Sequence, residues 1–118
     1  MFSGAGWADD PIAAVERDGS AMVVRLRGEL DLANVDRVRE ALLETAAGDG
    51  IDRLVLDLSK VAFVDSTVLG MLVEVRRALG DRPLALVAPG AEVVRALEVT
   101  GLIRHLAVHP SVAAALDA

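Results

Sequence analysis

The first third of the chain changes from a strand-like to a helix-like spacing of apolar residues. Residues 21–26 follow the period of two that a strand requires, and Asp18-Gly19 before them is a turn signal, so we expect a hairpin whose first strand covers residues 12–15. After Asp31 the apolar positions recur every three or four residues and stop at Gly48, which predicts an amphipathic helix. The residues that it would bury are Val35, Val38, Leu42 and Ala46.

The rest of the chain repeats short apolar runs followed by helical patterns. Residues 54–58 and 84–88 are apolar runs of the kind found in strands buried on both faces. The second run precedes a predicted helix over residues 91–100, and a last strand over 106–108 and a helix over 111–116 complete the order ββαβαβαβα. The helix after the first run has its apolar stripe at Val68, Leu72, Val75 and Leu79.

Strands that alternate with helices pair in parallel through right-handed crossovers. We therefore expect an α/β domain with a mixed sheet, in which an antiparallel opening hairpin is followed by parallel βαβ units, and about four helices pack against the sheet. The chain has 118 residues, 53% of them hydrophobic, which is the size of one domain with a core. The expected division is a flexible arm over residues 1–11, which contains Trp7, and a folded domain over residues 12–118.

Composition narrows the classes of function. A net charge of −6, with 12 basic residues among 18 acidic ones, argues against direct binding of nucleic acid. The chain has no cysteine, which removes disulfides and thiolate chemistry. No apolar run approaches the roughly 18 to 20 residues of a membrane span, and residues 1–11 do not resemble a signal peptide, so we expect a cytoplasmic protein without membrane association.

Enzymatic chemistry finds little support in the sequence. A nucleophile elbow around Ser66 would need glycine two positions to either side, where the chain has Val64 and Val68. His105 and His109 have no convergent ligands at metal-site spacing, so we expect structural roles for both. The nucleotide and zinc motifs G-x-x-x-x-G-K-S/T, G-x-G-x-x-G and H-E-x-x-H are absent, and we expect no cofactor and no metal.

A polar pivot, Asp65-Ser66-Thr67, separates an apolar run from the helix that follows it. The amino end of a helix favours negative charge, so a phosphate on this segment would be tolerated, although Ser and Thr there also act simply as helix caps. Asp31 follows the second predicted strand, as Asp65 and Ser66 follow the third. Because the carboxyl ends of parallel strands lie at one edge of a sheet, we expect these residues to converge there.

Two segments together resemble motifs of the STAS domain of anti-sigma factor antagonists. Residues 27–31 read Arg-Gly-Glu-Leu-Asp and match the family's G-E-L-D segment, while residues 65–70 read Asp-Ser-Thr-Val-Leu-Gly and are similar to its D-S-S/T-G-L-G segment. Val99-Thr100-Gly101-Leu102 is similar to a third segment, x-S-G-L, before the last strand. The resemblance covers about residues 12–116 and implies a STAS-like fold and a regulatory protein that is not an enzyme.

The resemblance also implies a switch. Ser66 would be phosphorylated by an anti-sigma factor with serine kinase activity, with Thr67 as the alternative acceptor, and a separate phosphatase would reset the cycle. The unphosphorylated protein, a monomer or weak dimer, would bind the kinase and so release a sigma factor. A phosphoserine adds about −1.5 to −2 charge beside Asp65, which would weaken that binding. The expected partner contacts are Asp31, Asp65, Ser66, Thr67 and Val68.

Val68 departs from the motif, because the family has glycine at this position. We expect the valine to present apolar surface close to where a kinase would approach. A protein that binds its partner without being phosphorylated, or one that serves a divergent kinase, is therefore an alternative. Another is a non-enzymatic STAS subunit of a lipid-transport ATPase or of a stress-sensing assembly, in which the same edge docks a helix. The enzymatic alternative is a small hydrolase that uses Ser66, which a serine-reactive probe would label.

Overall fold

The computed structural model describes residues 10–118. The expected arm over residues 1–11, including Trp7, therefore lies outside the described residues except for Asp10 and Pro11. Asp10 Oδ1 accepts a hydrogen bond from the backbone N–H of Ile12 at 3.0 Å, and the carbonyl of Pro11 accepts one from the N–H of Arg27 at 2.9 Å. These two residues thus contact the domain.

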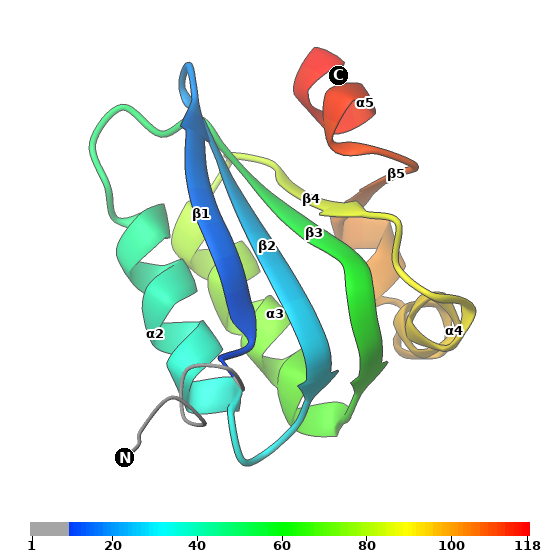
Figure 1. Cartoon of the computed structure of the whole chain (residues 1–118). Helices are drawn as coiled ribbons and strands as arrows, with labels where there is room; N and C mark the ends of the chain where they lie inside the picture. The colour runs from blue at the N-terminus through cyan, green and yellow to red at the C-terminus, as the bar shows by residue number, and fades with distance from the viewer. Residues whose placement is uncertain (1–9) are drawn as a thin grey trace, which may run out of the picture.

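Within residues 10–118, five strands and four α-helices follow one another in the predicted order (Figure 1). A four-residue 3₁₀-helix that was not predicted follows the third α-helix, and it is too short to produce a helical period in the sequence. The elements are β1 (Ile12–Asp18), β2 (Ala21–Leu30), α2 (Val35–Ala46), β3 (Arg53–Val64), α3 (Ser66–Leu79), β4 (Leu84–Val87), α4 (Ala91–Thr100), η1 (Leu102–His105), β5 (Ala107–His109) and α5 (Val112–Asp117).

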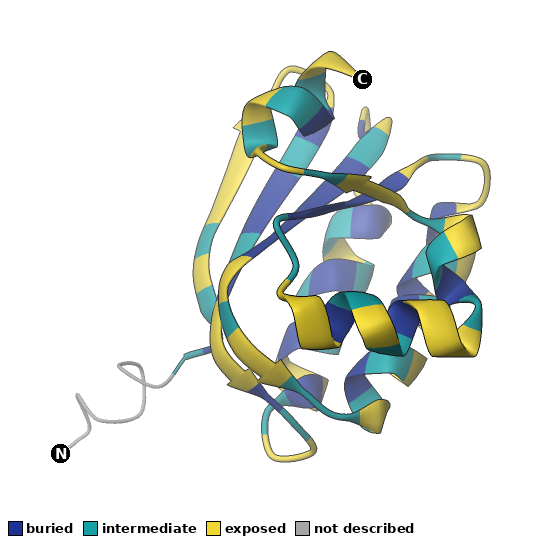
Figure 2. Ribbon diagram, turned by 90° about the vertical axis from the view of Figure 1, so that its right-hand side faces the viewer, coloured by how far each residue is buried: buried dark blue, intermediate teal, exposed yellow. Residues whose placement is uncertain are grey.

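The strands form one mixed sheet in the order β1-β2-β3-β4-β5. The β1–β2 pair is antiparallel and the other three pairs are parallel, which confirms the predicted architecture. Helices α2, α3 and α4 cover one face of the sheet, and α5 covers one end of the other face (Figures 1 and 2). None of the helices in residues 10–118 is long and apolar enough to cross a bilayer.

Hydrophobic packing on both faces explains the apolar runs at residues 54–56 of β3 and along β4, while Asp57 in β3 is a buried carboxylate with an ion-pair partner. On the helical face, Leu54 and Leu56 of β3 belong to the main core together with the buried residues of α2, α3 and α4. On the other face, Val55 and Ala85 pack against Ala115 of α5 in a smaller cluster. Successive strand residues point to opposite faces, so a strand covered on both sides is apolar at every position.

Strands β2 and β3 continue four and six residues beyond their predicted ends, to Leu30 and Val64. Two register shifts, one of them between Gly28 and Glu29, keep the strands paired through polar stretches that break the apolar pattern. Gly28 has a φ of +76°, a conformation that side chains disfavour and that a bulge uses. Both motifs therefore lie at the ends of two paired strands.

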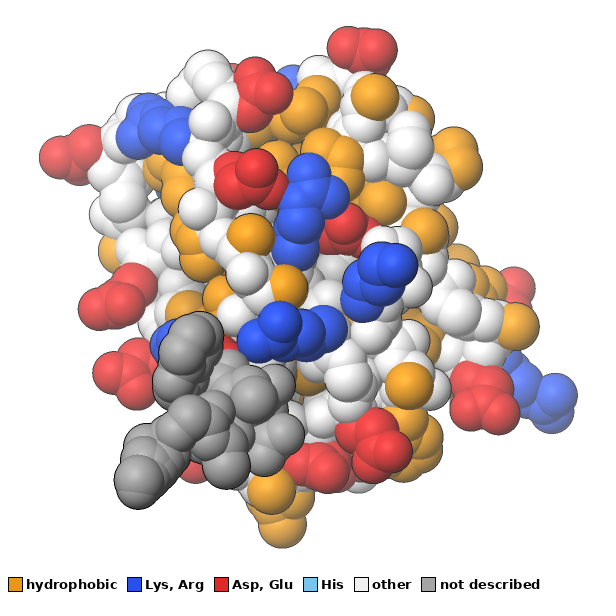
Figure 3. Space-filling model, in the orientation of Figure 1, with side chains coloured by type: hydrophobic (Ala, Val, Ile, Leu, Met, Phe, Trp, Pro, Cys, Tyr) orange, Lys and Arg blue, Asp and Glu red, His pale blue; other side chains and the backbone are white. Residues whose placement is uncertain are grey.

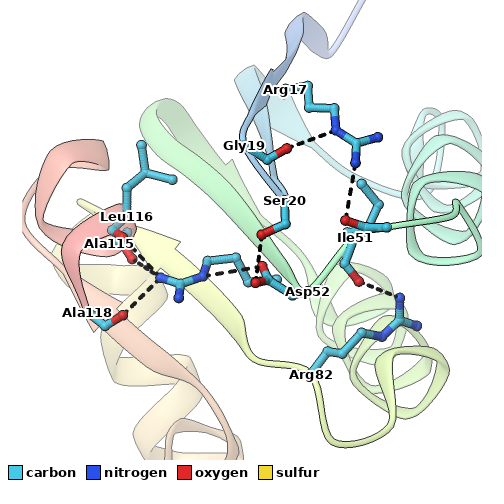
Figure 4. Close-up of polar contacts among 11 residues, drawn as sticks. Arg17, Gly19, Ser20, Ile51, Asp52, Arg82, Ala115, Leu116 and Ala118 are labelled. Carbon is cyan, nitrogen blue, oxygen red and sulfur yellow. Dashed lines mark hydrogen bonds and ion pairs between the residues drawn. The ribbon is translucent and has the colours of Figure 1, made fainter.

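Arginines fasten the connections at the opposite end of the sheet (Figure 4). Arg17 and Arg82 donate hydrogen bonds to the backbone carbonyls of Gly50 and Ile51, at 3.1 and 3.2 Å. Arg53 donates to three carbonyls at the end of α5, at 3.0 to 3.2 Å. These hydrogen bonds hold the loops and α5 in place at this end of the sheet. The two motifs lie at the opposite end, where the parallel strands have their carboxyl ends.

The sheet face that lacks α2, α3 and α4 carries charged side chains, as Figure 3 shows from that side. Arg25 forms ion pairs with Glu16 at 2.6 Å and with Asp57 at 2.8 Å. Asp57 is 7% exposed. Burial raises the pKa of Asp57, but hydrogen bonds from Ser59 and from Arg25 outweigh it and hold the pKa below its usual value.

Candidate functional site

The two motifs meet at the lower edge of the sheet in Figure 1, where β2 and β3 end. The backbone N–H of Asp65 donates to the carbonyl of Leu30 at 3.2 Å, and the N–H of Leu32 donates to Asp65 Oδ2 at 3.0 Å. The two segments that the topology placed together are therefore in direct contact. Asp31 faces its own loop, where its Oδ1 accepts from the N–H of Ala33 at 3.0 Å.

The loop between β2 and α2 is shaped by Asn34, a residue that the sequence reasoning missed. Asn34 Nδ2 donates to the carbonyl of Glu29 at 2.8 Å, and Asn34 Oδ1 accepts from the N–H of Asp31 at 3.0 Å. The signal for this role was an asparagine three positions after an aspartate at a helix start. Leu30, between Glu29 and Asp31, is 2% exposed, and its buried side chain holds this end of the loop against the core.

Asp65 caps α3. Its Oδ1 accepts hydrogen bonds from the backbone N–H groups of Thr67 at 3.0 Å and Val68 at 3.4 Å, and from the hydroxyl of Thr67 at 2.5 Å. The hydroxyl of Thr67, followed by the backbone N–H groups of Leu32, Val68 and Thr67, lowers the pKa of Asp65 from its usual value. The helix cap is thus an ionised aspartate, and Ser66 is not needed for that role.

Ser66 is the first residue of α3 and is exposed. Among the described residues, no group forms a hydrogen bond with its hydroxyl. Thr67 is half-buried and its hydroxyl is engaged by Asp65. The two hydroxyls that the sequence offered as acceptors therefore differ in accessibility, and Ser66 is the accessible one.

Val68 is 3% exposed and belongs to the main core. Its side chain lies near Leu26, Leu56 and Leu72 at the sheet–helix interface. This corrects the expectation that Val68 faces an approaching kinase, because the α3 residue two positions after Ser66 points to the opposite side of the helix. The valine fills space under the site.

Two large apolar side chains near Ser66 were not predicted. Leu32, in the loop that Asp65 holds, is 73% exposed, and Phe63, two residues before Asp65, is 45% exposed. Phe63 also lines a shallow hollow of about 200 Å³ between the end of β3 and the start of α4. Exposed apolar side chains beside a polar centre are typical of protein interaction surfaces.

No three histidine or acidic side chains among residues 10–118 are grouped closely enough to hold a metal ion. His105 lies beside α3 at the end of η1, and the carbonyl of His109 accepts a hydrogen bond from the N–H of Ala88. The site around Ser66 combines a hydroxyl, a carboxylate and exposed apolar side chains, a combination suited to binding another protein.

The sequence of this chain is similar to those of known proteins. A family model described as the STAS domain matches residues 12–115. The anti-sigma-B factor antagonist of Listeria monocytogenes is 36% identical over 89 residues, which cover 74% of this chain and 77% of that protein. The protein of the same description from Staphylococcus aureus is 33% identical over 81 residues, covering 67% and 74%.

Solved structures show the same similarity. An anti-sigma factor antagonist from Mycobacterium paratuberculosis superposes with a TM-score of 0.81 at 31% identity and covers 92% of this chain and 94% of its own. The phosphorylated form of the Bacillus cell fate determinant SpoIIAA superposes with a TM-score of 0.72, covering 88% and 96%, and at 20% identity it shows a shared fold.

Proposed function

Because the chain belongs to the STAS-domain family of anti-sigma factor antagonists, we propose that its unphosphorylated form binds an anti-sigma factor with serine kinase activity. That binding releases a sigma factor, and phosphorylation of Ser66 ends it. A separate phosphatase restores the active form, and the cycle takes place in the cytoplasm. The chain acts as a regulator in this proposal, and the chemistry of phosphoryl transfer belongs to the kinase.

The exposed, unengaged hydroxyl of Ser66 carries the proposal. A phosphoryl acceptor needs an accessible hydroxyl on a surface where a kinase docks, since the kinase supplies the nucleotide, the metal and the base. Asp65 already caps α3, so Ser66 is free of a structural role that would compete with phosphorylation. Thr67 lacks this freedom because its hydroxyl donates to Asp65.

The position of Asp65 explains why phosphorylation of Ser66 would weaken binding of the partner. The N–H groups of Thr67 and Val68 are held by the Asp65 carboxylate, so a phosphate on Ser66 meets that negative charge at the start of α3. A partner surface fitted to the neutral hydroxyl then meets repulsion and a new desolvation cost. A penalty of about 1 to 3 kcal/mol corresponds to roughly 5- to 150-fold in affinity, which suffices to release a partner.

Leu32 and Phe63 take the place of Val68 among the proposed partner contacts. Both are exposed, Leu32 is hydrogen-bonded to Asp65 through its N–H and Phe63 lies two residues before Asp65, whereas Val68 is in the core. Apolar side chains at the centre of an interface supply binding energy, and polar groups at its rim supply selectivity.

Affinity capture from a lysate of the native host tests the proposal. The baits are the wild-type chain, Ser66→Ala, Ser66→Glu and a control, Ala113→Glu, which adds the same charge on α5 at the other end of the sheet. We expect wild type, Ser66→Ala and the control to retain an ATP-binding anti-sigma factor kinase, and Ser66→Glu to lose it. Equal retention of a transport ATPase or a multi-STAS assembly by all four baits would overturn the proposal and favour the non-enzymatic subunit.

A further inference from the structure

Gly70 has no structural reason to be glycine. It lies inside α3, where glycine is less favourable than any residue except proline. Apart from its chain neighbours and the adjacent backbone of α3, a Cβ added at Gly70 would meet no heavy atom within 4 Å, and Gly70 is not among the glycines with positive φ. The fold would therefore accept a side chain at this position, and the missing side chain calls for a reason outside the chain.

Gly70 belongs to a stripe that begins at Ser66. Residues three and four apart lie on one face of a helix, so Ser66, Gly70, Val73 and Arg77 follow one another along α3. At a rise of about 1.5 Å per residue, the stripe spans about 16 Å from Ser66 to Arg77. A partner that contacts Ser66 is thereby led along the same face of α3.

A groove runs beside this stripe, between α3 and η1. One part, of about 270 Å³, is lined by Leu69, Gly70 and Val73 of α3 and by Leu102 of η1. A second part continues it past Val73 to Arg77 and shares Leu102. Thr100 and His105 also line the first part, so the groove is mostly apolar near Gly70, where the absence of a side chain leaves it open.

The far end of the groove is basic. Arg76 and Arg77 line only this part, His105 lines both parts, and Arg104 of η1 is exposed next to His105. Among the described residues Arg77 has no ion-pair partner, and Arg76 turns back to donate to the carbonyls of Gly80 and Arg82. The chain as a whole carries a net charge of −6, so this local excess of positive charge favours an acidic group on whatever binds there.

We propose that the groove between α3 and η1 receives an amphipathic segment of the anti-sigma factor kinase, apolar where it passes Gly70 and acidic where it reaches Arg77. This inference rests on the proposed function and extends its interface along α3. Leu32 and Phe63 would hold the partner on one side of Ser66, and the groove would hold it on the other. Gly70 permits the close approach that a side chain would prevent.

Binding to the purified anti-sigma factor kinase of the same organism tests the groove, measured by calorimetry in the presence of Mg–ADP so that no phosphoryl transfer occurs. Gly70→Leu fills the groove and Arg77→Glu reverses its charge. The matched controls are Ala78→Leu on exposed α3 surface and Arg95→Glu on α4. We expect each groove variant to weaken binding at least about tenfold and the controls to bind like wild type.

Stability and size measurements separate this result from misfolding and from self-association. Gly70→Leu should raise the melting temperature by a few degrees, because leucine is a better helix former, so weaker binding cannot be attributed to unfolding. Binding of both groove variants like wild type, while Ser66→Glu loses binding, would overturn the groove and leave the proposed function standing. A wild-type chain that binds no kinase would overturn both. A wild-type dimer that Gly70→Leu dissociates would assign the groove to a second copy and also overturn the inference.

Discussion

Asp65 connects the two segments that surround Ser66. One of its oxygens accepts the first N–H groups of α3, and the other accepts the N–H of Leu32, 33 residues earlier in the chain. One carboxylate therefore sets both the start of the helix and the position of the exposed Leu32. This arrangement requires two acceptor oxygens and favours the ionised form of Asp65.

The first prediction concerns Asp65→Asn. An amide has a single acceptor oxygen, so either α3 or Leu32 loses its partner, and the variant should unfold at lower urea concentration than wild type at pH 7. The pKa of Asp65 is lower in the folded state than its ordinary value of 3.8. Its stabilising contribution is therefore present above that value and is lost as the pH falls through the folded pKa.

Urea unfolding of both proteins at several pH values checks this linkage. The difference in stability between wild type and Asp65→Asn should shrink as the pH falls below 3.8. Asp10 and Asp57 also have lowered pKa values, so both proteins lose stability in acid, and only the difference between them reports on Asp65. A difference that stays constant with pH would contradict the role of the carboxylate charge.

The second prediction concerns the phosphorylated residue. Incubation with the anti-sigma factor kinase and Mg–ATP should place one phosphate on Ser66, because its hydroxyl is exposed and Thr67 donates to Asp65. Mass spectrometry of tryptic peptides identifies the site. Ser66→Ala should abolish incorporation, and Thr67→Val should keep it. Phosphate on Thr67 in the wild-type chain would contradict the assignment.

At the scale of elements, α3 has one face toward the core and another toward solvent. Two residues of the motif that begins at Asp65 lie on different faces. Val68 is buried under the site, and Gly70 is exposed in line with Ser66. The valine that departs from the family motif thus affects packing, and the glycine that agrees with it affects the surface. Residues two positions apart in one motif can therefore have different roles.

The third prediction restores the family residue at position 68. Val68→Gly removes a buried side chain and adds a helical glycine, so we expect a loss of about 2 to 4 kcal/mol in the free energy of unfolding. Val68→Ala, which keeps helix propensity, should lose less. Urea unfolding measures both. If Val68→Gly matched wild type in stability, Val68 would not contribute to the core.

At the scale of the whole molecule, the proposed binding site and the arginine contacts lie at opposite edges of the sheet. The carboxyl ends of β2 and β3 carry Ser66 and its surroundings, while arginines fasten the loops and α5 at the other edge. Helix α5 has only six residues and covers Val23 and Val55 on the face that α2, α3 and α4 leave open. Arg53 adds three hydrogen bonds to this small apolar contact.

The fourth prediction tests this division through Arg53→Leu. Loss of the three hydrogen bonds to the end of α5 should loosen that helix, and a loss of about 1 to 2 kcal/mol corresponds to roughly 5- to 30-fold faster amide exchange there. Binding of the kinase at Ser66 should be unchanged, because Arg53 begins β3 and Ser66 follows its far end. Arg95→Leu, on exposed α4 surface, is the control. Weakened kinase binding by Arg53→Leu alone would show that the two edges are coupled.

The sequence by itself determined the order of the elements, the type of sheet and the convergence of the two motifs. These properties follow from local periodicity and from the rules of parallel connections, which act over a few residues or a few elements at a time. The spacing of Val35, Val38, Leu42 and Ala46 predicted α2, which the structure has over Val35–Ala46 with these four residues buried. Apolar residues on one face and charged residues on the other stabilise a helix that packs on a core.

Only the tertiary structure decided which side each site residue faces and which groups hold it. The exposure of Leu32 and Phe63 and the use of both oxygens of Asp65 depend on residues far away in the chain. The ends of β2 and β3 were also missed, since register shifts keep polar residues in the sheet through pairing with a neighbouring strand. Long-range packing decides which way these side chains point and how far the strands stay paired. A local pattern of apolar residues does not show which distant segment will pack against them.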